Sequence, residues 1–342
     1  MPKIMRLLCT PLLLLMLAAP PVAAQSEQPF RLIVTHLEPP LVPNSVMDLA
    51  VTLGYFEREG VNVELVRVQQ TPSALAALQA GEGEMANVGV DALLLAMAAG
   101  ATDLRAVTSP NKSLPFLIAA KTEITSVADL AGARFAVGRI GSLDHSLSSL
   151  VLERLGGDLE TAQLVTLGQP NIRAQALLAG QVDATTLSIG TWTTLPDQAG
   201  LHVLVDQDAY FAAAPLVNKV NVVPTAVLAE RPEDVTAVIR ALIRISRDFA
   251  AQPELWVTAM EAALPGANAD DLRALADSFA SSWSVNGGMS ARELSQTVDW
   301  LHGTADFAGQ TAPELEDWID FTPVDRALAE LGVAQGADPA DR

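Results

Sequence analysis

One phrase of sequence occurs twice in this 342-residue chain and limits the folds that the chain can adopt. "LQAGEGEMANVGVDAL" (78–93) and "LLAGQVDATTLSIGTW" (177–192) both read Leu-x-Ala-Gly, two residues, an acid and a run of small residues. In each copy a helical pattern stops at a glycine, Gly81 or Gly180, where a left-handed helix C-cap forms easily. The phrase therefore predicts one helix–turn–strand step made twice, in two equivalent lobes.

Short apolar strands alternate with amphipathic helices around both copies. The pattern runs from a strand at 30–37 through a helix at 45–60 to a strand at 104–109, and it restarts between 115–120 and 200–206. Strands separated by helices of this length imply βαβ units and a largely parallel sheet. From Pro232 onward the pattern is mainly helical. The predicted fold class is α/β, with two lobes, a ligand cleft between them and a helical C-terminal extension.

The first two dozen residues differ from the rest of the chain. Lys3 and Arg6 precede the apolar run "LLCTPLLLLMLAAP", and small residues lead to Ala24, which together indicate a signal peptide over 1–24. The run is shorter than the ~20 residues that a membrane span needs. Cys9 precedes it, whereas a lipid-anchored cysteine would follow it. We expect an exported, soluble protein cleaved after about Ala24.

Charge and residue types exclude several classes of function. The net charge of −19 argues against a nucleic-acid partner. Cys9 is the only cysteine, so the mature chain has no thiolate nucleophile and no thiolate metal ligand. The four histidines, His36, His145, His202 and His302, do not have metal-ligand spacing. We expect no metal, no cofactor and no catalytic residue.

The order of the motifs resembles a known family. "GYFEREG" (54–60) and "ALQAGEGE" (77–84) in the first half are followed by "SVADLAGARFAVGRIG" (126–141) and "ALLAGQVDA" (176–184) in the second. From about 30 to 232 the chain is similar to periplasmic substrate-binding proteins of ABC importers, of the nitrate/sulfonate/taurine and thiamine-pyrimidine (NMT1/THI5-like) type. The resemblance implies a type II periplasmic binding protein fold. It also implies a monomer that delivers a small-molecule solute to an ABC permease in the inner membrane.

In that fold the chain crosses between the lobes twice, here near 109–115 and 214–221. The implied domains are a signal peptide (1–24), the first part of lobe I (25–112), lobe II (113–216), the return to lobe I with the C-terminal helices (217–332), and a flexible tail (333–342).

Ligands of open α/β sheets bind at the carboxyl ends of strands, where helix N-termini point N–H groups into the cleft. Each residue selected by this rule also has a structural alternative: Thr71 and Ser142 as helix caps, Arg139 in a salt bridge, Trp192 in lobe packing. The candidate ligand-binding residues are His36, Glu38, Gln70, Thr71, Asp91, Ser109, Arg139, Gly141, Ser142, His145, Ser188, Trp192 and Asn218.

Three acids, Glu38, Asp91 and Asp144, fall in the predicted cleft loops. A carboxylate at a helix N-terminus uses the N–H donors and repels a second anion. This favours a neutral, amine-like or pyrimidine-like solute. If the aspartates are only helix caps, the alternative is a binder of sulfonate, taurine or nitrate anions.

Two other classes compete with a transport protein. The fold resembles that of a desulfinase and of a pyrimidine synthase, whose chemistry uses cysteine, and the mature chain has none. We therefore expect no enzymatic activity. The second class is a ligand-sensing partner of a membrane receptor.

Overall fold

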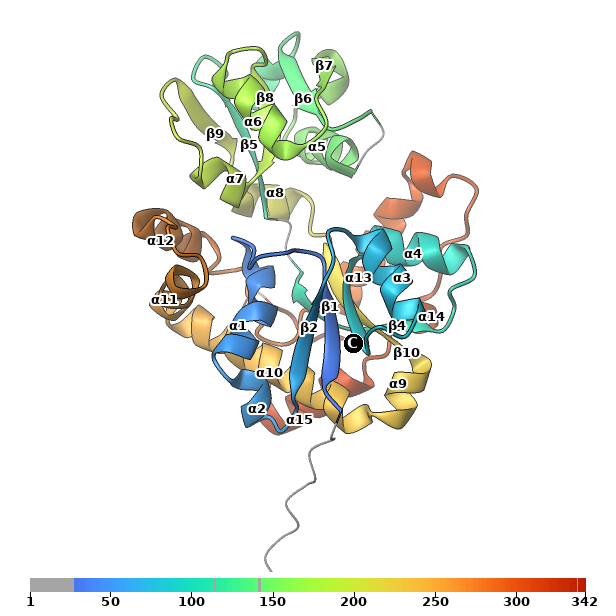
Figure 1. Cartoon of the computed structure of the whole chain (residues 1–342). Coiled ribbons are helices and arrows are strands. Elements are labelled where there is room, and N and C mark those ends of the chain that lie inside the picture. Colours follow the sequence, from blue (N-terminus) through green and yellow to red (C-terminus); the bar gives the residue numbers. More distant parts are fainter. Residues whose placement is uncertain (1–27, 113–114, 141–142, 337) are drawn as a thin grey trace, which may run out of the picture.

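The structure is a computed structural model that describes residues 28–112, 115–140, 143–336 and 338–342. The chain forms two lobes, each built around a five-stranded sheet with helices packed against it (Figure 1). The predicted signal peptide and two candidate residues, Gly141 and Ser142, lie outside the described residues.

The sheet of lobe I has the strand order β2-β1-β3-β10-β4. β1 runs parallel to β2 and β3, whereas β10 is antiparallel to both of its neighbours, β3 and β4. β10 enters this sheet from late in the sequence, after the chain has passed through lobe II. The strands are β1 (Phe30–Val34), β2 (Val63–Arg67), β3 (Met85–Gly89), β4 (Leu104–Asn111) and β10 (Lys219–Pro224).

The sheet of lobe II repeats this plan with the order β7-β6-β8-β5-β9. β6 is parallel to β7 and β8, and β5 is antiparallel to β8 and β9. In both lobes the strand that follows a crossing is the antiparallel one and takes fourth place, so the two sheets are equivalent strand by strand. The strands are β5 (Phe116–Lys121), β6 (Arg134–Val137), β7 (Gln163–Thr166), β8 (Ala184–Ser188) and β9 (Leu201–Val205).

The repeated phrase is the step from helix to strand in each lobe. α3 (Thr71–Gln79) leads into β3, and α6 (Pro170–Leu178) leads into β8. The glycine after each helix has a positive φ, 74° at Gly81 and 67° at Gly180. Residues with a Cβ rarely adopt this conformation, which explains why the phrase contains glycine there.

The acid of the phrase has a structural role in both lobes. The backbone N–H of Glu84 donates to the carbonyl of Arg31 over 2.9 Å, and the N–H of Arg31 donates back to Glu84 Oε2 over 2.6 Å. Asp183 and Arg134 exchange the same two bonds over 2.8 and 2.9 Å. Each acid thereby fixes the register between the helix–strand step and the first parallel strand of its lobe.

Helices fill the connections between the strands. The predicted helix over 45–60 is divided in the structure because Gly54, with φ of 71°, interrupts it. Lobe I has η1 (Pro43–Ser45), α1 (Val46–Thr52), α2 (Tyr55–Arg58), α3 and α4 (Val90–Ala98). Lobe II has η2 (Val127–Leu130), α5 (Leu143–Arg154), η3 (Leu159–Thr161), α6, α7 (Ile189–Thr193) and α8 (Gln207–Ala213).

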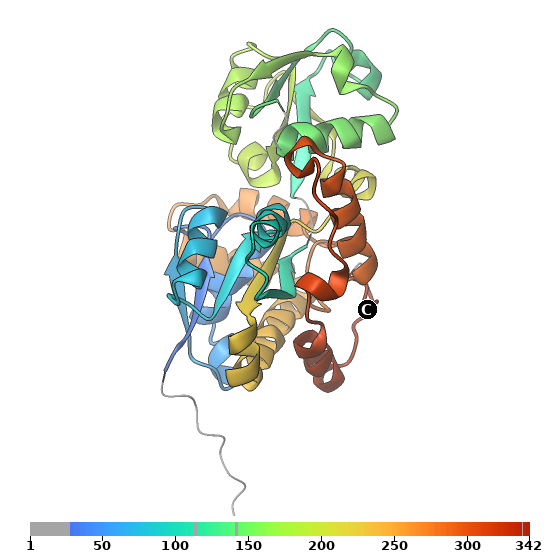
Figure 2. The ribbon, with the colours of Figure 1, turned by 90° about the vertical axis from the view of Figure 1, so that its right-hand side faces the viewer.

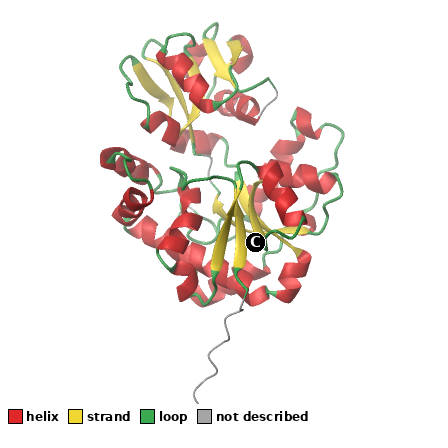
Figure 3. Cartoon of the chain, in the orientation of Figure 1, coloured by secondary structure: helices red, strands yellow, loops and turns green. Residues whose placement is uncertain are grey.

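The C-terminal third is helical and packs mainly on lobe I. α10 lies against α1, α2 and α15, while α12 contacts α7 of lobe II. α13 and the segment after it rise beside lobe I toward lobe II (Figure 2), and Figure 3 shows the strands of each lobe flanked by helices. The elements are α9 (Thr225–Glu230), α10 (Pro232–Ala251), α11 (Pro253–Ala263), α12 (Ala269–Ser278), α13 (Ala291–His302), η4 (Ala305–Phe307), α14 (Leu315–Trp318) and α15 (Thr322–Leu331).

Within the segment 333–342, expected to be a flexible tail, Asp338 and Arg342 make hydrogen bonds with the loop before α13. Asp338 is buried, and its Oδ2 accepts hydrogen bonds from the backbone N–H groups of Asn286 and Gly288, over 2.6 and 3.1 Å. Arg342 donates from Nη1 to the carbonyl of Met289 over 2.7 Å. The small polar residues of this segment lack an apolar pattern, so the sequence does not reveal that a buried carboxylate holds it in place.

Candidate functional site

A pocket lies between the two lobes, at the carboxyl ends of their parallel strands. Lobe I contributes Asp91 in the first turn of α4, lobe II contributes Leu147 on α5, and Asn218 comes from the return crossing. Ligands of α/β proteins bind in this position. Two predicted residues, Asp91 and Asn218, therefore line the pocket. Val90, Val217, Thr297, Trp300 and Leu301 complete most of its wall.

The aromatic side chain of this pocket is Trp300. It is half-buried on α13 and also lines two adjoining pockets between α13 and lobe II. Thr297, Trp300 and Leu301 have the spacing that places residues on one helix face. The sequence alone favours Trp192 instead. Trp192 is half-buried on α7 and packs against the main hydrophobic core.

Lys219, which the sequence analysis did not select, lies at the lobe I edge of the site. It is the first residue of β10 and pairs with Gly89, the last residue of β3. Its Nζ donates to Thr35 Oγ1 over 2.5 Å, just beyond the end of β1. A Cβ added to Gly89 would lie 2.4 Å from Asp91 Oδ1. The glycine therefore allows the Asp91 carboxylate to fold back over the end of β3.

Lys219 and Asp91 influence each other's charge. Burial lowers the pKa of Lys219 to about 8, and the negative charge of Asp91 opposes this shift. Burial also raises the pKa of Asp91, while its own N–H, that of Ala92 and the Lys219 charge act in the opposite direction. Among the described residues, no carboxylate oxygen lies within 4.0 Å of Lys219 Nζ. Lys219 is therefore a half-buried cation next to the pocket-lining Asp91 and Asn218, without an ion-pair partner in the part of the chain that the structure describes.

Two predicted ligand residues, Gln70 and Thr71, lie at the start of α3 and differ in burial. Thr71 is half-buried, and its Oγ1 accepts a hydrogen bond from the N–H of Gly89 over 3.3 Å. This bond joins the N-terminus of α3 to the end of β3, next to Lys219. Gln70 is exposed and makes no side-chain cap.

On the lobe II side, Asp144 has structural partners. Its Oδ2 accepts the N–H of Gly138 over 2.7 Å and lies 3.6 Å from Nη1 of Arg173. Arg173 is buried and also donates to the carbonyls of Gly168 and Thr186, over 2.5 and 3.2 Å. The Asp144 charge is therefore balanced within lobe II.

The other predicted ligand residues of lobe II lie away from the pocket. Ser188 caps α7, because its Oγ accepts the N–H of Thr191 over 3.2 Å. His145 is half-buried on α5, and Arg139 is exposed in the loop after β6. None of these three lines the pocket described above.

Two predicted ligand residues have structural partners in lobe I. His36 Nε2 lies 2.7 Å from Oδ2 of the buried Asp48, whose Oδ1 accepts from Arg67 Nη2 over 2.6 Å. Ser109 is fully buried and donates to the carbonyl of Lys219 over 2.6 Å. In this structure Ser109 therefore contacts the backbone behind Lys219 and not the pocket. Glu38 is exposed in the loop after β1.

The described residues contain no group of three or more His, Cys, Asp or Glu side chains arranged to hold a metal ion. None of their helices combines the length and apolarity that a membrane crossing requires.

Two lobes that enclose a pocket at facing strand ends define a binding protein fold, and comparison with known proteins agrees. The sequence matches the NMT1/THI5-like family over residues 46–255, so the chain belongs to this family. None of the curated protein sequences compared with it matches.

Solved structures share the periplasmic binding protein fold. The periplasmic aliphatic sulphonate binding protein SsuA from Escherichia coli superposes with a TM-score of 0.69 at 19% identity, over 86% of this chain and 92% of SsuA. The ligand binding component of an ABC-type import system from Staphylococcus aureus gives 0.65 at 13% identity, over 88% and 99%. A mutant of DSZB, solved in complex with biphenyl-2-sulfinic acid, gives 0.65 at 17% identity, over 88% and 99%.

Proposed function

We propose that this protein is the solute-binding component of an ABC importer. It would capture a small solute between its lobes in the periplasm and present it, as a monomer, to a membrane permease. The observation that carries the proposal is the interlobe pocket, to which both lobes and the return crossing contribute side chains. The likeness to a binding component of an import system and the signal peptide expected over 1–24 support it.

The charges around the site favour a different ligand class from the neutral or amine-like solute expected from the sequence. That expectation depended on Glu38, Asp91 and Asp144. Glu38 is exposed, and Asp144 is balanced by Arg173. Asp91 faces the positive charge of Lys219. A buried cation is stabilised by an opposite charge that the ligand can supply.

We therefore infer that the solute carries an anionic group that binds against Lys219. Thr35 and Thr71 supply hydroxyl groups at the same edge. Asp91 would accept a hydrogen bond from a donor elsewhere on the solute, and Trp300 would cover its apolar part. Sulfonates, taurine and carboxylates with such a donor fit this description.

The test is thermal unfolding of the refolded, ligand-stripped protein against alkanesulfonates, taurine, nitrate, aromatic carboxylates, pyrimidines and amines. A ligand at one hundred times its dissociation constant adds about 2.7 kcal/mol of stability, which shifts the unfolding temperature measurably. We expect an anion to produce this shift in the native protein. Lys219→Met should weaken the binding of that anion by at least roughly tenfold, because the charge-assisted contact is lost.

Lys121→Met is the matched control, because Lys121 is a partly exposed lysine that pairs with Asp183 in lobe II. It should bind the anion as the native protein does. Equal binding by Lys219→Met and the native protein would contradict the assigned ligand contact. A shift with amines or neutral pyrimidines alone would contradict the ligand class but leave the transport role standing. Loss of solute uptake in cells that lack this protein would support transport, whereas unchanged uptake would favour the sensing alternative.

A further inference from the structure

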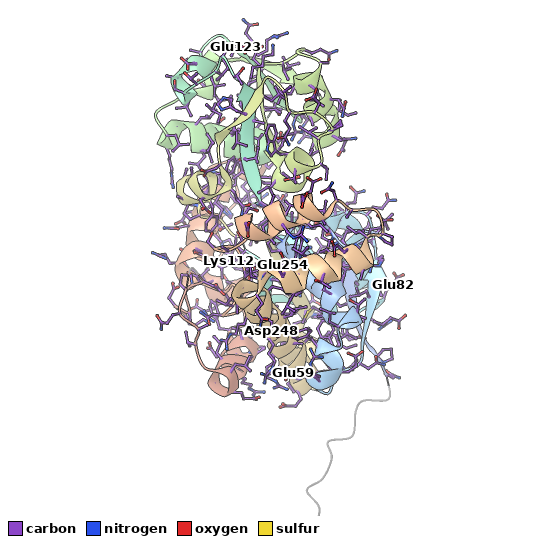
Figure 4. The ribbon with its side chains drawn as sticks, turned by 90° about the vertical axis from the view of Figure 1, so that its left-hand side faces the viewer. Glu59, Glu82, Lys112, Glu123, Asp248 and Glu254 are labelled. Carbon is purple, nitrogen blue, oxygen red and sulfur yellow. The ribbon has the colours of Figure 1, made fainter. Side chains whose placement is uncertain are left out.

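Three charged side chains form a buried cluster where the chain leaves lobe I. Lys112 directly follows β4 and is completely buried, and Figure 4 shows it in the part of lobe I nearest to lobe II. Its Nζ lies 3.2 Å from Oε2 of Glu293, in the first turn of α13, and 3.9 Å from Oδ1 of Asp338. The ring of Phe211, on α8 of lobe II, lies 5.4 Å from the same ammonium. The cluster therefore joins three distant segments at the crossing.

The cluster differs from a surface ion pair because all three of its charged side chains are buried. Ions are costly to bury, so they persist where several partners compensate each charge. Asp338 is compensated twice, since its Oδ2 accepts two backbone N–H groups while its Oδ1 faces Lys112. Burial raises the pKa of Asp338, and the positive charge of Lys112 opposes this shift.

One series of contacts runs from Asp338 to the binding strand. Asp338 fixes the loop that contains Gly287 and Gly288, both with positive φ. The carbonyl of Gly287 accepts the N–H of Ser109 over 2.8 Å, and a Cβ on Gly288 would lie only 2.2 Å from the Ser109 carbonyl oxygen. Ser109 in turn donates to the carbonyl of Lys219. The loop and β4 thus fit closely together directly behind Lys219.

A second series runs through Lys112 itself. Its carbonyl accepts the N–H of Asn218 over 3.1 Å, which joins the outgoing and returning crossings. The carbonyl of Asn218 accepts the N–H of Val90 over 3.2 Å, at the start of α4. Asn218 and Val90 both line the interlobe pocket. Both series therefore begin at Asp338 and end at the candidate site.

We propose that Asp338 is a positioning residue, which holds the lobe I end of the crossing and thereby sets the positions of Asn218 and Lys219 in the site. Through this carboxylate, residues 338–342 contribute to the geometry of the candidate site.

Native-state hydrogen exchange of the full chain without solute tests this proposal. Asp338→Asn leaves Lys112 paired with Glu293, so the buried cation keeps one counter-ion and we expect the protein to fold. The variant weakens the acceptor for two N–H groups. Exchange should accelerate by roughly tenfold or more at the amides of Ser109, Asn218 and Val90 and remain unchanged in β8 of lobe II.

Asp341→Asn is the matched control from the same segment. Oδ2 of Asp341 accepts the N–H of Arg292 over 3.1 Å at the start of α13, whereas Lys112 pairs with Glu293 and Asp338. It should leave the three amides unchanged. Equal acceleration in both lobes would mean that Asp338 only stabilises the protein, and unchanged exchange at the three amides would also overturn the proposal.

Ser109→Ala offers a second test that changes no charge, should the Asp338 variant fail to fold. It removes the hydrogen bond to the Lys219 carbonyl and should accelerate exchange in β10 while β8 is unaffected. Exchange in β10 equal to that of the native protein would contradict the first series of contacts. These measurements need no solute, so their outcome is independent of the proposed transport role.

Discussion

The two lobes share a plan, yet they end the repeated helix–strand step differently. In lobe I the step ends with Gly89 and Asp91, and the cation beside them, Lys219, lacks an ion-pair partner among the described residues. In lobe II the equivalent positions are Ser188, which caps α7, and Gly190. The acid near that edge, Asp144, is balanced by Arg173. The same scaffold therefore leaves the positive charge of Lys219 without an ion pair in lobe I. In lobe II it pairs the negative charge of Asp144 with Arg173.

Substituting Arg173 should have the largest effect on stability. The equivalent position in the lobe I repeat is a buried alanine, Ala74, so the arginine is a specific feature of lobe II. Arg173→Met removes the guanidinium from Asp144, which keeps the N–H of Gly138, and from two backbone carbonyls. Removing one member of a buried ion pair typically costs roughly 3–5 kcal/mol. Hydrogen exchange in β8, followed against that in β3, should report this loss for lobe II alone.

The control for this prediction is Arg273→Met. Arg273 is an exposed arginine on α12 whose two ion pairs are also exposed, and such pairs contribute about 0–1 kcal/mol. A similar small effect for Arg173→Met would mean that Asp144 is not balanced by Arg173, and the contrast between the lobes would no longer hold.

The pH dependence of Lys219 should separate binding from stability. Its pKa is about 8 in the folded protein against an ordinary value of 10.5. Between these pH values the unfolded chain binds more protons than the folded chain, so the free energy of unfolding should rise as the pH increases from 8 to 10.5. Affinity for an anionic solute should change in the opposite direction and fall by up to roughly tenfold for each pH unit above 8, because the ammonium loses its charge.

Lys219→Met should remove both pH effects, as measured by chemical unfolding and by titration calorimetry across this range. Anion affinity that is constant between pH 7 and 10 in the native protein would contradict a contact with Lys219. A fall in affinity that persists in Lys219→Met would assign the titration to another group.

The sequence predicts the lobes well because their determinants are local. The spacing of Leu78, Ala80 and Gly81 specifies a helix end, and its recurrence at Gly180 implies the second lobe. The site depends on contacts between distant segments. Lys219 donates to Thr35 across the end of β3. Trp300 lies on α13, whose sequence has the amphipathic pattern of an ordinary packing helix. No local sequence pattern predicts these contacts, because they depend on the order of the strands in the sheet and on how α13 packs.

Asp91 and Asp144 also show why sequence alone does not identify the site, because both have the same sequence context. Asp91 and Asp144 both stand in the first turn of a helix. Their charges have different effects because Lys219 lies near the first and Arg173 near the second. Only the three-dimensional structure distinguishes a carboxylate that lines the interlobe pocket from one that stabilises a lobe.

The acids of the repeated phrase, Glu84 and Asp183, allow the two lobes to be compared at equivalent positions. Oε1 of Glu84 accepts Nη2 of Arg31 over 2.6 Å, and Oδ1 of Asp183 accepts Nη2 of Arg134 over 2.7 Å. Asp183 has a further partner, Lys121 Nζ at 2.8 Å. For Asp183, hydrogen bonds from Arg134 lower the pKa of the carboxyl group and outweigh burial. For Glu84, burial would raise the pKa, but the bonds from Arg31 lower it overall.

Glu84→Gln and Asp183→Asn should each destabilise their own lobe by about 1–3 kcal/mol, the range for a charge-assisted hydrogen bond. The loss should be greater for Asp183→Asn because of Lys121, and Lys121→Met should reduce it to the value for Glu84→Gln. Since both pKa values are lowered, the stabilisation is present above the ordinary carboxyl pKa and is lost as the pH falls below it. Exchange rates in β3 and β8 at neutral pH measure each loss separately. Equal losses for the two single variants would show that Lys121 adds nothing, and that the two copies of the phrase are energetically equivalent.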